Sequence, residues 1–195
     1  MNRNRKNING GVKQMVKESV YDWLEAAVFA LIMIVFIFSF CFRMVGVNGD
    51  SMNDTLYEGD RLLLRTNRYT PVFGDIVVIE RAAEKPLIKR VIGVAGDKIR
   101  VDAAEHTVYR NDRKLIEPYV AEEYRQDFWK GQEEITVPEG MIYVLGDHRN
   151  LSLDSRMLGL IDLRHVMGKA YYRVFPFDQF GSIYEQEAYI EEYSK

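Results

Sequence analysis

The sequence predicts a mostly β protein, in which an antiparallel β-sheet domain follows a single N-terminal transmembrane helix. The helix is predicted by an uncharged apolar run from Ala26 to Phe42. The sheet is predicted by short apolar or alternating stretches that recur between turn signals such as Phe73-Gly74-Asp75 and Pro138-Glu139-Gly140. The close spacing of these stretches leaves little room for crossover helices, which favours antiparallel pairing.

The apolar run is long enough to cross a bilayer. From Leu24 to Phe42 there are 19 positions, and only Glu25 is charged. A hydrocarbon core of about 30 Å needs roughly 20 helical residues, and this run is apolar all round rather than along one stripe. We therefore expect a transmembrane anchor at residues 21–43 rather than the buried helix of a soluble fold.

The charge distribution predicts how the anchor is oriented. Residues 1–20 contain five basic residues and one acidic residue, so the charge of this segment is +4. Because the net charge of the whole chain is −3, the remaining residues together carry −7. Only Arg43 follows the run closely, so the positive-inside rule places residues 1–20 in the cytoplasm and residues 44–195 outside the cell membrane. We expect a single-pass protein of the plasma membrane.

A cleaved signal peptide is the competing interpretation of the same segment. The apolar run exceeds the roughly 7 to 15 residues of a usual signal-peptide core, and no A-x-A-like cleavage pattern follows it. Val47 and Gly49 form only a weak small-residue pair. Cleavage there would trim the turn that holds Ser51, so an uncleaved anchor is favoured.

Strand-like patterns fill most of residues 44–195. They fall at residues 61–64, 76–79, 87–94, 98–101, 107–109, 135–137, 141–145 and 166–174. Residues 111–134 combine aromatic side chains, including Phe128 and Trp129, with many charges, and we expect an inserted excursion there. The acidic end from Tyr184 onward is expected to be a loosely held tail or a short surface helix.

Composition excludes several classes of protein. An apolar fraction of 47% with 28% charged residues is ordinary for a folded chain. Cys41 is the single cysteine and lies in the apolar run, so no internal disulfide is possible. The three histidines lack ligand spacing, no phosphate-binding glycine loop is present, and the exterior is acidic. We expect no metal, no cofactor and no nucleic-acid partner.

Ser51 is the first candidate for chemistry, because it follows the apolar run closely in a small turn, Asn48-Gly49-Asp50-Ser51-Met52. A nucleophile placed there would act on a substrate that is also in the membrane. A serine in a Gly-Asp-Ser turn is more often only a turn residue. Catalysis needs a base for its proton, a group that holds the base, and a site for the oxyanion.

Lys89 is the candidate base. It lies in the apolar stretch 87–93, where burial would lower the pKa of the amine because the charged form loses hydration. A lysine of pKa near 10.4 needs a fall of about 2 to 3 units to act near neutrality. Arg90, the next residue, cannot be the base because its guanidinium stays protonated. Among the histidines, His148 is the only candidate base in a motif-like setting. The alternative is an edge-strand lysine that limits aggregation or reaches solvent.

A dense polar segment from Gly146 to Gly159 completes a pattern that resembles the type I signal peptidases, the membrane-anchored Ser/Lys proteases of the bacterial leader peptidase family. Their serine box, S-M-x-P-T-L, is similar to Ser51-Met52-Asn53-Asp54-Thr55-Leu56, and their lysine box to Lys89-Arg90-Val91-Ile92-Gly93 with Gly96-Asp97 following. Their box G-D-N-R-x-x-S-x-D-S-R is similar to Gly146 through Arg156, and Gly74-Asp75-Ile76-Val77-Val78 resembles an intervening box.

The resemblance implies a role for each site residue. Ser51 would be the nucleophile, with its backbone N–H in the oxyanion site; Lys89 would be the general base, and Ser152 would orient its amine. Asp154 and Arg156 would form a structural ion pair. The substrates would be preproteins whose signal peptides are removed at the outer membrane surface, with the lipid bilayer as a second partner, and we expect a monomer.

Three positions differ from the family's pattern. Asp54 replaces the usual proline, which either loosens the turn or supplies an Asx-type hydrogen bond instead, and His148 replaces the usual asparagine. Some members have a serine donor at the position of Gly49, so here a backbone group or water must supply the second oxyanion donor. The alternatives to this function are a self-cleaving repressor peptidase, disfavoured by the anchor, and a non-catalytic tethered β domain that binds exported chains.

Overall fold

The computed structural model describes residues 19–36, 42–66, 69–120 and 134–184. The chain divides into two compact units, Met1–Cys41 and Phe42–Lys195. The first unit contains a helix, Ser19–Phe36, whose side chains are all exposed and which is long and apolar enough to cross a membrane. Residues 1–18 of the expected basic segment and residues 37–41 of the expected anchor lie outside the described residues.

A large sheet forms the framework of the second unit. Its strand order is β1-β2-β11-β3-β4-β9-β10, with β12 paired to β11, and every pair is antiparallel. The strands are β1 (Phe42–Gly46), β2 (Arg61–Arg65), β3 (Ile76–Ile79), β4 (Leu87–Gly93), β9 (Met141–Leu145), β10 (Ile161–Asp162), β11 (Val166–Phe175) and β12 (Gly181–Ser182).

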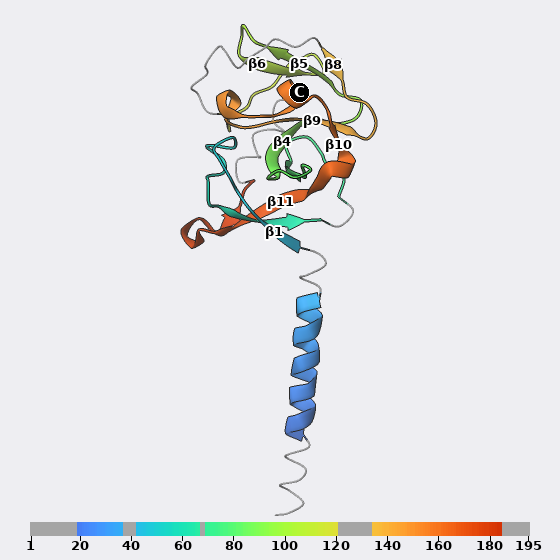
Figure 1. The fold of residues 1–195 in the computed structure, drawn as a ribbon, viewed down its shortest axis with the longest axis vertical. Coiled ribbons are helices and arrows are strands. Elements are labelled where there is room, and N and C mark those ends of the chain that lie inside the picture. The colour runs from blue at the N-terminus through green and yellow to red at the C-terminus, as the bar shows by residue number, and fades with distance from the viewer. Residues whose placement is uncertain (1–18, 37–41, 67–68, 121–133, 185–195) are drawn as a thin grey trace, which may run out of the picture. The chain divides into compact units, whose positions relative to one another are not determined.

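A second, four-stranded sheet has the order β7-β6-β5-β8 and lies at the end of this unit away from β1 and β11 (Figure 1). It consists of β5 (Lys98–Asp102), β6 (Thr107–Arg110), β7 (Arg113–Lys114) and β8 (Ile135–Thr136). Short helical turns complete the unit: η2 (Arg149–Leu151), α2 (Ser155–Leu158), η3 (Leu163–His165) and η4 (Phe177–Gln179).

Strand β4 is covered on both faces, which decides the environment of Lys89. Ile88 belongs to one buried apolar cluster, Val91 to a second and Ile92 to a third. Every residue of β4 after Leu87 is buried. The side chains on both faces of this strand are therefore shielded from water. A polar residue here must find its hydrogen-bond partners inside the protein.

The eight strands expected from the sequence are all present, with ends that differ by at most one residue. Strand β1 was not expected, and it begins at Phe42, within the last two residues of the expected anchor. It forms because it pairs with β2, with Met44 opposite Leu63. The short strands β7, β10 and β12 were not expected either.

The expected excursion at residues 111–134 begins as part of the small sheet. Asn111 and Asp112 both have positive φ, which suits the tight hairpin between β6 and β7. Tyr119 and Val120 are buried. Residues 121–133, with Phe128 and Trp129, and the tail from residue 185 lie outside the described residues.

Candidate active site

Ser51 lies in the turn that joins β1 to β2, and this turn is fixed by its own backbone and by the core. The N–H groups of Thr55 and Leu56 both donate to the carbonyl of Met52, at 2.9 and 2.8 Å. Met52 and Leu56 are 1% and 0% exposed, while Ser51 is half-buried. Two buried apolar side chains thus hold the turn in place while the serine remains accessible.

Lys89 extends from β4 to this serine. Its Nζ lies 2.6 Å from Ser51 Oγ and donates to the carbonyl of Ile88 at 2.9 Å. Lys89 is 1% exposed, and burial lowers the pKa of its amine to about 8; the charges of Asp154 and Asp147 act in the opposite direction, and that of Arg156 lowers it. The amine is therefore neutral in a substantial fraction of molecules near pH 8.

The loop after β9 packs against the main chain of the serine. A Cβ placed on Gly146 would lie 2.2 Å from Ser152 Oγ and 2.5 Å from the carbonyl oxygen of Ser51, so only glycine fits. The backbone N–H of His148 donates to that same carbonyl at 3.1 Å. The contact of His148 with the serine is thus made by its main chain, which any residue at this position provides.

Asp154 organises this loop. Its carboxylate accepts hydrogen bonds from the N–H of Gly146 at 3.0 Å and from Arg156 Nε and Nη2 at 2.9 and 2.7 Å. Burial raises the pKa of Asp154, but the hydrogen bonds and charge of Arg156 outweigh burial and the pKa is lowered overall. The expected ion pair between Asp154 and Arg156 is therefore present and buried.

Ser152 lies in the same loop and is 2% exposed. By hydrogen-bond geometry its Oγ has no partner among the described residues, although it lies close enough to Asp154 to help lower the pKa of that carboxyl. The expected hydrogen bond between Ser152 and Lys89 is not formed in this structure, where the contacts of Lys89 Nζ are Ser51 and Ile88.

Three residues that the sequence reasoning did not assign connect the serine turn to the lysine strand. Asp147 is fully buried and binds Arg90 through both oxygens, at 2.9 Å to Nε and 2.8 Å to Nη2. The hydroxyl of Thr55 donates to the same carboxylate at 2.6 Å. The position of Arg90 in an apolar strand could have indicated such a pair from the sequence, because a buried guanidinium requires a carboxylate partner.

The start of the excursion covers the back of this network. The Arg90 guanidinium lies 3.8 Å from the ring centre of Tyr119. Glu117 accepts two hydrogen bonds from Arg149, at 2.9 and 2.6 Å, and Arg149 Nε donates to the carbonyl of Gly146 at 3.0 Å. Residues that were expected to form a separate excursion are thus part of the support for the site.

Two positions that differ from the family's pattern lie in exposed parts of the turn. Gly49 has φ of +79°, a conformation that a serine would adopt only with strain. Asp54 is exposed, and among the described residues its carboxylate accepts no hydrogen bond, so it forms no Asx-type turn. Within the same residues, no group of three His, Cys, Asp or Glu side chains could hold a metal.

A buried lysine against an accessible serine on a β framework is the arrangement that serine endopeptidases of the Ser/Lys type require. The family model described as "Signal peptidase, peptidase S26" matches residues 20–175. Signal peptidase I of Bacillus licheniformis is 37% identical over 84% of this chain and 92% of its own length. Signal peptidase IB of Staphylococcus aureus (strain COL) is 30% identical over 85% of this chain and 94% of its own.

A crystal structure of a signal peptidase I from Enterococcus faecalis aligns with 52% of this chain and 97% of its own, at 28% identity and a TM-score of 0.42. The family match and the relatives' identity are sufficient by themselves: the chain belongs to the S26 family of signal peptidases. It is an endopeptidase that removes signal peptides from preproteins, and its apolar N-terminal helix fits a membrane anchor. A non-catalytic binding domain is not favoured.

Proposed function

We propose that Ser51 is the nucleophile of this peptidase and Lys89 its general base. The contact of 2.6 Å between Lys89 Nζ and Ser51 Oγ, made by a buried amine, supports this assignment most directly. The neutral amine accepts the serine proton as Oγ attacks the scissile carbonyl, and the resulting ammonium then protonates the leaving amine. The Ile88 carbonyl keeps the amine oriented between these steps.

The oxyanion is held by the backbone N–H of Ser51 and by a second backbone or water donor, since Gly49 offers no side chain. Ser152 orients Lys89 in the ammonium form, when Nζ carries one more proton to donate. Its hydroxyl is buried and, by hydrogen-bond geometry, unpaired among the described residues, which supports this role. Asp154 and Arg156 keep the loop in shape around it.

The substrate segment binds in an extended conformation beside the serine. Strand β1 is at the end of the strand order and leads into the Ser51 turn, and one of its edges is unpaired among the described residues and can pair with a peptide. Alternate side chains of such a peptide point toward the protein. We expect the sites for these side chains to be small, so that alanine-like residues fit best at the first and third positions before the cut.

The chain is divided into a cytoplasmic segment at residues 1–20, a single membrane anchor at residues 21–43 and an extracytoplasmic catalytic unit at residues 44–195 of the plasma membrane. The basic residues before the apolar run support this orientation. A monomer suffices for catalysis, because both members of the dyad come from one chain.

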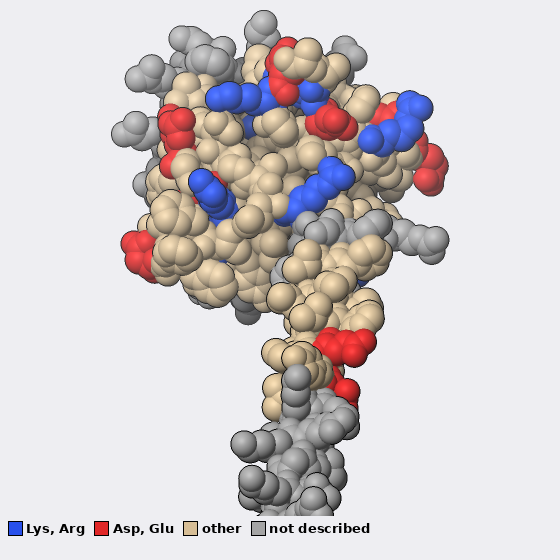
Figure 2. All heavy atoms as spheres, turned by 60° about the horizontal axis from the view of Figure 1, so that its bottom comes forward, with Lys and Arg blue, Asp and Glu red and all other residues tan. Residues whose placement is uncertain are grey.

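The bilayer is also a partner of the catalytic unit. Met44, Leu63 and Tyr172 lie opposite one another on β1, β2 and β11 and therefore share one sheet face, on which Met44 is 67% and Tyr172 46% exposed. Exposed Phe175, Phe177 and Phe180 follow on the chain after Tyr172. Figure 2 turns this end of the unit forward and shows broad uncharged areas with both basic and acidic side chains around them.

Removing either member of the dyad tests the assignment. We expect Ser51→Ala and Lys89→Ala each to abolish cleavage of a signal-peptide substrate while the protein stays folded. Ser182→Ala and Lys98→Ala are matched controls at exposed positions and should cleave at the wild-type rate. Substantial residual cleavage by either dyad variant contradicts the assignment.

A further inference from the structure

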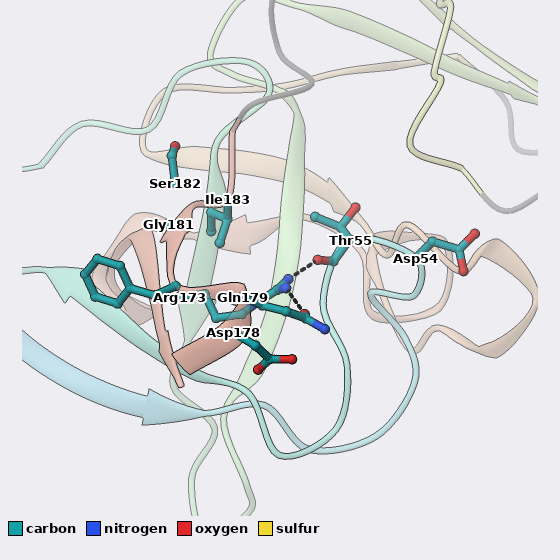
Figure 3. Close-up of a pocket in the computed structure, with 9 residues that line it drawn as sticks. Asp54, Thr55, Arg173, Asp178, Gln179, Gly181, Ser182 and Ile183 are labelled. Atoms are coloured by element: carbon teal, nitrogen blue, oxygen red, sulfur yellow. Dashed lines mark hydrogen bonds between the residues drawn. The ribbon is translucent and has the colours of Figure 1, made fainter. Parts of the chain in front are cut away.

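Arg173 of β11 contacts the serine turn independently of Lys89. Its Nη2 donates to the carbonyl oxygen of Thr55 at 2.6 Å, and Nη1 donates to the side chain of Gln179. Its Nε lies 2.9 Å from Asp60 Oδ2, and the Arg173 and Asp60 side chains are only 13% and 4% exposed. Figure 3 shows the Arg173 side chain reaching the carbonyl of Thr55, and both residues line a pocket of about 490 Å³.

Thr55 is consequently held at two atoms by two separate ion pairs. On one side its carbonyl accepts from Arg173, whose counterion is Asp60. On the other side its hydroxyl donates to Asp147, whose counterion is Arg90, the residue next to Lys89. Charge-assisted hydrogen bonds of this kind are shorter and stronger than neutral ones, so Thr55 has little freedom to move.

The position of Thr55 is passed to Ser51 through the backbone of the turn. The N–H groups of Thr55 and Leu56 both donate to the carbonyl of Met52, the residue that follows Ser51. The carbonyl of Ser51 is in turn held by the N–H of His148. A shift of Thr55 would therefore move Met52 and change how Ser51 Oγ approaches Lys89 Nζ.

We propose that Arg173, with Asp60 as its counterion, is a positioning residue for the nucleophile: it acts through Thr55 and does not touch the substrate. This inference rests on the proposed role of Ser51 and Lys89 and adds the residues that fix their geometry. Displacements of about 1 Å in an active site cost up to about a hundredfold in rate. Loss of one of the two contacts that hold Thr55 is expected to lower kcat about tenfold.

The test compares Arg173→Ala with Arg110→Ala in the full-length protein. Arg110 also forms a partly buried ion pair at 2.9 Å, with Asp97, and its guanidinium lies over the ring of Phe73 rather than against the serine turn or Lys89. Cleavage of one preprotein is measured below the unfolding temperature of both variants. Arg173→Ala should lower kcat about tenfold with KM within about twofold of wild type, whereas Arg110→Ala should keep the wild-type kcat.

A pH profile separates positioning from a change in the base. Arg173 does not contact Lys89, so the apparent pKa of kcat/KM should stay at its wild-type value in Arg173→Ala. A wild-type kcat in this variant, a raised KM with unchanged kcat, or a displaced pKa would each overturn the proposal. If Arg173→Ala fails to fold, Asp60→Asn decides: a lower kcat at unchanged KM supports the proposal and a wild-type kcat overturns it.

Ser51→Ala assayed in parallel separates this inference from the proposed function. An active Ser51→Ala contradicts the dyad itself, and the positioning role with it. An inactive Ser51→Ala beside a fully active Arg173→Ala contradicts only the role of Arg173.

Discussion

At the scale of single residues, Lys89 combines opposing influences. A fall in pKa from 10.5 to about 8 corresponds to roughly 3 kcal/mol of preference for the neutral amine. The Asp147 and Asp154 carboxylates reduce that preference, but each is occupied by its own arginine. Because each carboxylate is paired with an arginine, neither forms a salt bridge with the lysine amine. A salt bridge would stabilise the charged ammonium, whereas a general base must be neutral.

Gly146 offers a direct test of how closely the loop and the serine must approach. Gly146→Ala places a methyl group against Ser152 Oγ and the Ser51 carbonyl, so the serine must shift. We expect the cleavage rate to fall at least tenfold, because misplaced reacting groups lose rate steeply. Gly181→Ala is the control, since its added Cβ meets nothing within 4 Å. Equal activity of the two variants would show that this close approach is unimportant.

The sequence was enough to propose the members of the dyad, but it did not show the contacts that connect them to the rest of the site. Ser51 and Lys89 could be proposed from their local settings and from the resemblance. The pairs Arg90–Asp147 and Thr55–Asp147 could not, because 57 and 92 positions separate their members and only the folded sheet brings them together. The role of Arg173 was invisible for the same reason: its carbonyl acceptor is 118 positions away.

At the scale of elements, strands with a clear alternation or a short apolar core were predictable. Strand β1 was not predicted, because its first residue, Phe42, is also the last residue of the apolar run, and Phe42 and Arg43 were both assigned to the anchor. Its strand conformation depends on pairing with β2, five residues in register from Phe42 opposite Arg65 to Gly46 opposite Arg61. Pairing with β2 therefore places Phe42 and Arg43 in a strand, although composition assigned them to the helix.

The outward face of β1, β2 and β11, with the chain that follows β11, should bind the membrane interface. Met44→Ser combined with Phe177→Ser removes two side chains that are 67% and 81% exposed. A loss of about 1.4 kcal/mol of apolar burial weakens binding to the membrane tenfold. We therefore expect KM for a vesicle-embedded preprotein to rise about tenfold. Cleavage of a soluble peptide should not change.

Ile116→Ser serves as the control for this face, because Ile116 is 52% exposed and follows the small sheet. It should leave both substrates unaffected. An equal loss on soluble and embedded substrates by the double variant would argue against a lipid-binding face.

At the scale of the whole molecule, the proposed orientation can be measured with thiol labelling in intact cells. Cys41→Ser removes the only cysteine, and new cysteines are then placed singly at Lys6 and at the exposed Lys98. A membrane-impermeant maleimide should label Lys98→Cys in intact cells and Lys6→Cys only after lysis. The reverse pattern would place the catalytic unit in the cytoplasm.

The dependence of kcat/KM on pH tests the central claim, that a buried neutral lysine activates Ser51. Below the pKa of about 8, Lys89 is mostly protonated and cannot accept the serine proton, so activity falls as pH decreases. We expect kcat/KM to rise about tenfold per pH unit up to about pH 8 and to reach a plateau above it. A profile that is flat from pH 6 to 9.5, or that rises near pH 6.5 as for a histidine base, would contradict it.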